Sequence, residues 1–233
     1  MLAALFSWAL LALSPPASAQ TFSGDFSSSA GARFNGINNV EDTVNAIAVD
    51  SATAGGPFVY VTGRSGTGPN AFTIKYSSAG AMLANASPGG RGEGLAVDAG
   101  AGAVYVVGMD SASDWLIYKY DLNLVFLTSA AFGSADIESA FAVALDASGN
   151  PYVVGYTTSS THHDLHVRRY TPQLALLSSQ TFTSASGVND FDRAHAAAVD
   201  SNGNLFVAGQ RHTDATLYDW WVLKLNPSLV MLA

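Results

Sequence analysis

A fourfold internal repeat constrains the fold of this chain more than any other feature of its sequence. A short apolar segment ends in Ala-Val-Asp or Ala-Leu-Asp four times, at Asp50, Asp98, Asp146 and Asp200. The aspartates are 48, 48 and 54 residues apart, and after each one an aromatic residue precedes a glycine by three positions; these pairs are Tyr60 and Gly63, Tyr105 and Gly108, Tyr152 and Gly155, and Phe206 and Gly209. Self-similarity at a nearly fixed period indicates one supersecondary unit that is stacked repeatedly.

Two more strand-like runs complete each unit. The third run carries a polar residue and, five positions later, a basic one; these pairs are Asn70 and Lys75, Asp114 and Lys119, Asp164 and Arg169, and Asp219 and Lys224. The fourth run follows a short turn, at residues 82–83, 124–127, 174–177 and 229–232. Turn residues separate the runs, and no sustained helical period is present. We therefore predict an all-β fold, a β-propeller of four-stranded blades with four visible repeats.

The first run of each unit has the pattern expected of the innermost strand of a blade. Two and four residues before its aspartate stand small residues, such as Ala48 and Ala46, and mostly larger apolar residues occupy the other face. Small side chains are expected where neighbouring blades converge, and bulky Trp220 and Trp221 lie on a third run, where the blade is wider. For these two tryptophans core packing is favoured over a sugar-stacking platform, because neighbours on a strand point to opposite faces.

The turns and the charged pairs are interpreted as structural. Residues 146–150 and 200–204 place Asp, Gly and Asn at hairpin positions, although oxygens spaced in this way also occur in calcium loops. No bidentate glutamate completes such a loop, which favours the hairpin turn. The base of each third run lies on the opposite face of the strand from its polar partner. We expect it to extend over the blade while the acid caps the preceding loop.

The amino-terminal residues 1–19 are typical of a signal peptide. An apolar run over residues 1–13 is followed by Ser-Pro-Pro and by the triplet Ala17-Ser18-Ala19. The run is too short to span a bilayer and no later segment is long enough, so no membrane span is predicted. Residues 20–233 then form the propeller domain. Its fourth unit stops inside the fourth run, so either the chain is a fragment of a larger propeller or residues 21–34 supply the missing outer strand.

Composition and motif spacing argue against several classes of protein. There is no cysteine, which removes disulfides, thiolate metal sites and cysteine nucleophiles. The formal net charge is -8 and only 12% of residues are charged, which argues against nucleic-acid binding. Residues 63–66 lack the spacing of a nucleophile elbow, and residues 90–94 lack the helix and lysine of a phosphate loop. We assign no catalytic residue, no metal and no cofactor.

Three acids and three histidines make up the predicted binding face. An acid stands eight positions before the first-run aspartate in three units, and the loops after the second run are longest in units three and four; the residues are Asp42, Glu138, Asp192, His162, His163 and His212. In a propeller these loops emerge on one side of the molecule, which suits ligand binding. The alternatives are solvated loop acids and ordinary loop histidines. Zinc binding with Asp164 is disfavoured because no ligand-spacing motif is present.

Part of the sequence is similar to a known repeat family. Residues 192–209 followed by residues 219–227 resemble the seven-bladed β-propeller repeat of exported bacterial proteins, whose units share an acid, Ala-Val-Asp, Gly-Asn, Tyr-Val-x-Gly and a later Asp and Lys. The chain is also similar to the related delta-60 repeats. The second unit departs from the pattern at Gly90 and over residues 99–103. The resemblance implies a scaffold for interactions outside the cell or at its surface, without a defined reaction.

These observations lead to two functional hypotheses. The first is a non-catalytic scaffold that is secreted, periplasmic or on the cell surface and binds a protein or carbohydrate ligand. The second is an extracellular lyase or hydrolase acting on a polysaccharide, with Asp42, Glu138 and Asp192 gathered over the central channel together with loop histidines. The lack of catalytic spacing in the sequence favours the scaffold.

Overall fold

The computed structural model describes residues 21–23, 33–35, 41–66, 70–133, 137–159, 162–183, 191–213 and 217–232. The predicted signal peptide lies outside these residues. Strands, turns and bends make up the described segments, and none of them contains a helix long and apolar enough to cross a membrane. The prediction of an all-β fold is confirmed.

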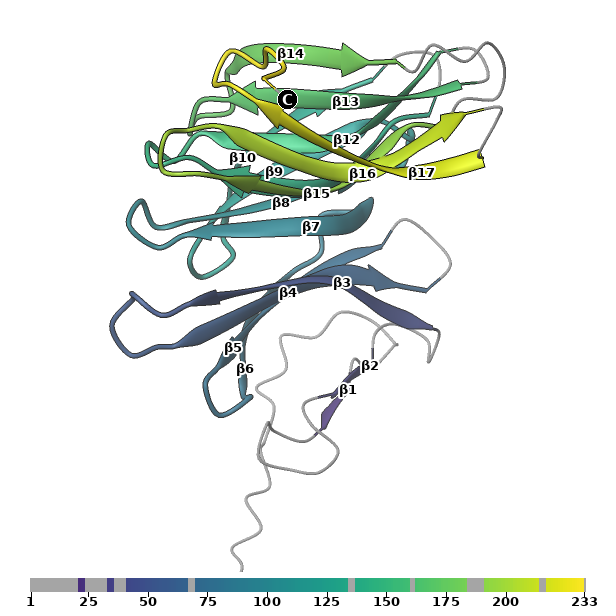
Figure 1. Cartoon of the computed structure of the whole chain (residues 1–233). Coiled ribbons are helices and arrows are strands. Elements are labelled where there is room, and N and C mark those ends of the chain that lie inside the picture. The colour runs from purple at the N-terminus through teal and green to yellow at the C-terminus, as the bar shows by residue number, and fades with distance from the viewer. Residues whose placement is uncertain are drawn as a thin grey trace, which may run out of the picture.

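Each repeat forms one antiparallel sheet, and the four sheets are the blades of a β-propeller (Figure 1). The first blade contains β3 (Asp42–Asp50), β4 (Phe58–Ser65), β5 (Ala71–Ser77) and β6 (Met82–Ala86). The second contains β7 (Arg91–Asp98), β8 (Ala103–Met109), β9 (Trp115–Asp121) and β10 (Phe126–Phe132). The third contains β11 (Ser139–Leu145), β12 (Pro151–Ser159), β13 (His162–Tyr170) and β14 (Leu176–Phe182). The fourth contains β15 (Arg193–Val199), β16 (Leu205–Thr213) and β17 (Leu217–Leu225), so the predicted propeller is confirmed.

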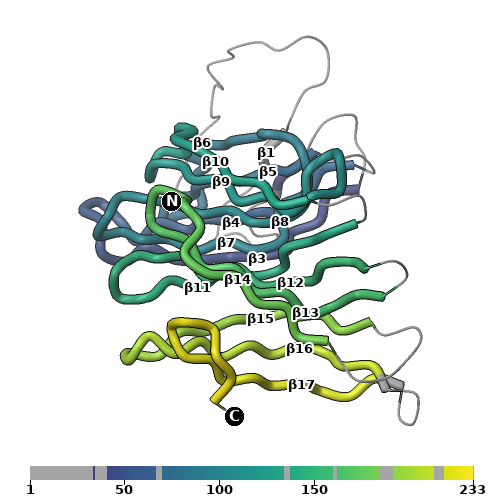
Figure 2. The backbone as a smooth tube through the Cα atoms, turned by 90° about the horizontal axis from the view of Figure 1, so that it is seen from above, coloured from purple at the N-terminus to yellow at the C-terminus, as the bar shows by residue number. Residues whose placement is uncertain are grey.

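The fourth blade has three strands within the described part of the chain. Its fourth run contributes a single bridge, in which Met231 pairs with Leu225 of β17. The inner strands of the blades contact one another in the order β3, β7, β11 and β15. In Figure 2 the yellow strand β17 lies at one edge of the molecule and β6 of the first blade lies at the opposite edge.

The amino-terminal strands do not complete the fourth blade. β1 (Thr21–Ser23) pairs with β2 (Arg33–Asn35) in a separate two-stranded sheet. Phe34 of β2 packs near the first blade, with its ring centroid 5.0 Å from that of Phe72. The suggestion that residues 21–34 supply the missing outer strand is therefore wrong for their described part, because residues 21–23 and 33–35 pair with each other.

The hydrophobic core lies between the blades rather than within them. Three buried clusters fill the three junctions between consecutive blades. We call the side of a sheet that is turned to the following blade its forward face, and the other side its back face. At the first junction Ala46 and Ala48 of the forward face join Leu95 and Val97 of the next back face in one cluster. This confirms the predicted inner strand, with small residues on one side and larger ones on the other.

A tyrosine and a basic residue fasten each of the first three blades to turns of the next one. The Tyr60 hydroxyl donates to the Leu122 carbonyl at 2.8 Å, and Lys75 Nζ donates to Asn123 Oδ1 of the same turn at 3.2 Å. The other junctions repeat this pattern, with Tyr105 and Lys119 on Pro172, Tyr152 on Gly203, and Arg169 on Pro227. The base extends over the blade as predicted, and its bond across the junction accounts for its recurrence.

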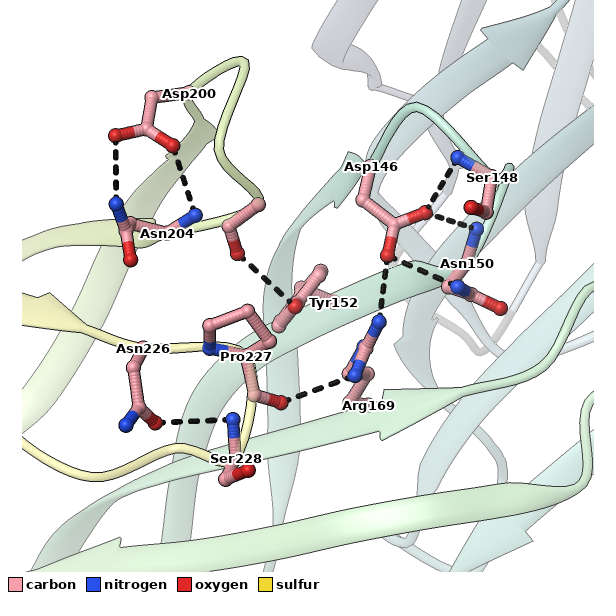
Figure 3. A network of polar contacts seen from close by, with 11 residues as sticks. Asp146, Ser148, Asn150, Tyr152, Arg169, Asp200, Asn204, Asn226, Pro227 and Ser228 are labelled. Atoms are coloured by element: carbon pink, nitrogen blue, oxygen red, sulfur yellow. Dashed lines mark hydrogen bonds and ion pairs between the residues drawn. The ribbon is translucent and has the colours of Figure 1, made fainter.

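The Asp-x-x-Gly-Asn stretches form the hairpin turns that the sequence predicts. Asp146 Oδ1 accepts the backbone N–H groups of Ser148 and Asn150, both at 2.9 Å. Its Oδ2 accepts Asn150 Nδ2 at 2.9 Å and Arg169 Nη2 at 2.8 Å (Figure 3). Burial raises the pKa of Asp146, but these bonds outweigh it, so the pKa lies below its ordinary value. Donors of the protein thus occupy both oxygens, as a turn requires, and Asp200 repeats the arrangement with its own turn.

Candidate binding face

A β-bulge occurs at the same position in all four inner strands. The pairing of each inner strand with its neighbour shifts five residues before the repeat aspartate, and the residues skipped by the pairing are Asn45, Glu93, Phe141 and His195. A bulge bends its strand and re-aims a side chain out of the regular ladder. We call these four the bulge residues. The fold presents them at equivalent places, one on each blade, and they differ completely in chemistry.

The bulge residues meet in pairs across two blade junctions. Asn45 Nδ2 donates to Glu93 Oε2 and to the Gly92 carbonyl, both at 2.9 Å, which joins the first blade to the second. Phe141 stacks on His195 with ring centroids 5.4 Å apart, which joins the third blade to the fourth. Asn45 and His195 are exposed, and Glu93 and Phe141 are partly exposed. All four can therefore be reached from solvent.

An aromatic row continues from Phe141 across the third blade. Tyr156 lies 5.7 Å from Phe141, and it stacks on His163 with centroids 4.2 Å apart and ring planes 4° from parallel. Arg193 Nε donates to His163 Nδ1 at 2.8 Å, and its guanidinium lies 4.9 Å from the centre of the Tyr156 ring. Phe191 packs edge-on against His163 at 4.9 Å. These contacts fix the row beside the bulge residues.

Arginines bring positive charge to this face. Burial raises the pKa of Glu93, and the charges of Arg91 and Arg64 oppose that shift. Burial also raises the pKa of Tyr156, where the charges of Arg193 and Arg91 act in the opposite direction. Cationic groups beside aromatic rings suit a ligand that carries acidic or hydrogen-bonding groups.

One half-buried histidine and one buried histidine, His163 and His166, predict a loss of stability in mild acid. Burial lowers the pKa of both His163 and His166 to about 4, and Arg193 adds to the effect at His163. In the unfolded chain both titrate near 6.5, so the unfolded state binds protons first as the pH falls from 6.5 to 4. The free energy of unfolding should therefore decrease across that window. Urea unfolding at several pH values measures it, and a His163→Gln, His166→Gln double variant with the same pH slope would contradict this assignment.

Two acids of the predicted binding face are buried in the connections between blades. Glu138 and Asp192 each have an exposed fraction of 0%. Thr157 Oγ1 donates to the Glu138 carboxylate at 3.4 Å. The Asp192 N–H donates to the His163 carbonyl at 2.8 Å, and its Oδ1 accepts the backbone N–H of His212 at 2.9 Å. The alternative of solvated loop acids is wrong for these two residues, which bond the connections to residues of β12, β13 and β16.

The structure groups only part of the predicted residues. His163, Asp192 and His212 come together, because the Asp192 N–H donates to the His163 carbonyl and the Asp192 carboxylate accepts the His212 N–H. Asp42 instead begins β3 on the first blade, and His162 begins β13 on the third. Within the described ranges, no three His, Asp or Glu side chains are arranged to hold a metal ion. A direct role of the six residues in ligand binding stays a prediction.

Sequence reasoning missed the bulge residues, Tyr156 and Arg193. A bulge leaves little trace in a hydrophobic pattern, because a period of two assumes an unbroken ladder. One signal was available: when the units are aligned on their aspartates, the position five residues earlier carries a different side chain in each unit, next to a residue that is small in all four.

Known proteins resemble this chain in fold. No protein-family model and no curated protein sequence matches it. A chain of hydrazine synthase from Kuenenia stuttgartiensis is similar with a TM-score of 0.60 and 13% identity, over 83% of this chain and 54% of that one. A protein of unknown function from Bacteroides thetaiotaomicron is similar with a TM-score of 0.42 and 14% identity, over 82% and 49%. This chain spans about half the length of either structure, and the first likeness supports the fold alone.

Proposed function

We propose that this chain is a non-catalytic binding scaffold that holds a protein or glycan ligand on the face formed by the bulge residues. The observation that carries the proposal is a contrast between repeat positions. Positions that build the blade keep their residue type in all four units, as the first-run aspartate and the second-run glycine do. The bulge position carries asparagine, glutamate, phenylalanine and histidine instead. The fold places this position where solvent can reach it, and packing does not limit which residue type stands there. Such a position is suited to ligand recognition.

Export and family membership are part of this proposal. The pattern of residues 1–19 supports export to the medium, the periplasm or the cell surface. The linked positions of the four units, together with their folding into blades, support membership of the seven-bladed β-propeller repeat family of exported bacterial proteins. Such a scaffold uses its loops and inner strands for recognition, while the blades supply rigidity.

Removing the ring pair of the bulge residues tests the binding function. A Phe141→Ser, His195→Ser double variant should lose about tenfold or more of its affinity, because it deletes two adjacent contact side chains at once. The chain is first screened on a glycan array and by capture of proteins from culture medium, and each ligand found is then titrated against both forms.

The control for this test lies at the other ends of the strands. Ser148→Ala and Ser201→Ala change exposed residues of the inner turns and should leave affinity unchanged. Circular dichroism establishes that each variant is folded. Finding no ligand, or a ligand that the double variant binds equally well, would refute the proposal.

The polysaccharide-acting alternative gains no support from the site. Glu138 and Asp192 are both fully buried, and each accepts a hydrogen bond from the protein itself. A general acid or base must come within hydrogen-bond reach of its substrate. Two of the three acids on which this alternative depends therefore have structural positions.

A further inference from the structure

The first and fourth blades each leave apolar side chains uncovered on one sheet face. On the forward face of the fourth blade, Trp220 and Val222 are 96% and 64% exposed. On the back face of the first blade, Ile47 and Val49 are 65% and 59% exposed. Large apolar groups gathered in this way mark interaction surfaces.

The repeat identifies these positions as blade-to-blade contacts. The residues that correspond to Trp220 and Val222 in the other units are all buried, and those of the second and third units pack against the next blade; they are Ala71, Trp115 and Leu165, and Thr73, Ile117 and Val167. The residues that correspond to Ile47 in the second and third units, Leu95 and Val143, are buried against the preceding blade. The two exposed faces are thus the two halves of a junction that the chain forms three times.

We propose that the forward face of the fourth blade binds the back face of the first blade of a second copy of this chain. The contact is heterologous, and two such contacts related by a twofold axis close a pair of copies. The four described blades of each copy then make one assembly of eight, within the range of known propellers. The association continues an interface that the molecule already contains rather than requiring a new one.

The apolar groups of the two faces match. Trp115, at the repeat position of Trp220, packs on His166 of the next blade with ring centroids 5.2 Å apart. The residue of the first blade that corresponds to His166 is Phe72, which is 5% exposed and packs on Phe34 of β2. Both rings line a hollow of about 220 Å³ together with Ile47. Trp220 of one copy would enter this hollow and meet the rings of Phe34 and Phe72 of the other.

The inner strands match in size as well. Ala196 and Ala198 are exposed on β15 at the positions where Ala46 and Ala48 of β3 receive the larger residues of β7. The larger residues Ile47 and Val49 of a second copy would meet these alanines in the same way. Small residues meet larger ones in this way at the first two internal junctions, whereas Ala142 meets Ala197 and Val199 at the third.

Lys224 supplies the polar part of the contact. It lies 5.3 Å from the ring of Phe206, as Lys119 lies 5.5 Å from Tyr105. The bases of the other three blades donate to turns of the following blade. The first blade offers the equivalent turn, closed by the Ser77 N–H on the Ala81 carbonyl at 2.8 Å. Lys224 of one copy is thus placed to donate to this turn of the other.

The mass of the full chain in solution tests the proposal. Sedimentation equilibrium should give twice the mass of one chain. Ile47→Lys and Val222→Glu, each alone, should raise the dissociation constant of the pair by about tenfold or more, because each puts an unpaired charge into both junctions. Leu127→Lys is the matched control, since Leu127 is an exposed apolar residue of the outer strand β10, and it should leave the mass unchanged.

Mixing the two variants separates this contact from other modes of association. In an equimolar mixture one junction has two native faces and the other opposes lysine to glutamate, so the pair should form again. Circular dichroism before mixing shows that both variants are folded. A monomer, a polymer longer than two copies, a pair that resists either substitution, or a mixture that fails to associate would each overturn the proposal.

Discussion

Replacing Gly108 with alanine is expected to lower the free energy of unfolding by about 3 kcal/mol. Gly108 lies on β8 opposite Gly92, where the bulge of β7 begins. A Cβ added there would clash with the carbonyl oxygen of Arg91, a backbone atom that no rotamer change can move. The inner strand would have to leave its ladder, which loosens the cores on both sides of the blade. Urea unfolding of the variant measures the loss.

Gly100→Ala is the matched control for Gly108→Ala. Gly100 is exposed in the turn between β7 and β8, and a Cβ added to it would lie at an ordinary 3.5 Å from Asp98 Oδ1. Its effect should stay within about 0.5 kcal/mol. If the two variants unfold at the same urea concentration, the bulge of β7 is not the reason that position 108 requires a glycine.

This clash also explains why a glycine recurs at the same position of the second run in every unit. Gly63, Gly155 and Gly209 stand opposite the start of a bulge as Gly108 does, and an added Cβ would meet a carbonyl oxygen at each of them. The recurrence of the glycine predicted a repeat and its strands correctly. The bulge itself was not predictable, because it is a property of two paired strands, and so the residues that it presents were missed.

The buried acids show a second limit of sequence reasoning. Glu138 and Asp192 occupy loop positions between units, and loop acids are ordinarily solvated. In this fold both side chains are fully buried beside a neighbouring strand, where the Glu138 carboxylate accepts the hydroxyl of Thr157 and the Asp192 carboxylate accepts the backbone N–H of His212. Position along the chain indicated that each acid precedes an inner strand, but not the depth of its side chain.

The adjacent tryptophans of β17 show that the sequence alone also does not predict which apolar residues are buried in the core. Core packing was favoured for both, and alternation along the strand placed them on opposite faces. Trp221 packs against the buried cluster of the third junction, which confirms the interpretation, whereas Trp220 is exposed, which makes it wrong there. Whether a face is buried depends on the presence of a following blade, which no local pattern records.

Replacing Trp115 with alanine is expected to cost about 3–5 kcal/mol of unfolding free energy. Trp115 is buried at the second junction, edge-on to Phe132 with centroids 6.1 Å apart and close to His166 of the next blade. Its indole N–H has no hydrogen-bond partner among the described residues, so the loss is one of packing. The cavity would open the contact between two blades, and thermal or urea unfolding measures the result.

Trp220→Ala makes the same chemical change at the same repeat position of the fourth blade. Both substitutions are best made in the Ile47→Lys background, so that association between copies does not contribute to stability. Because Trp220 is almost fully exposed, its loss should leave the unfolding midpoint unchanged there. Equal effects of the two substitutions would mean that the tryptophan stabilises its own blade. Unequal effects would show that the tryptophan stabilises the fold only where a following blade buries it, since the repeat position and the residue type are the same in both.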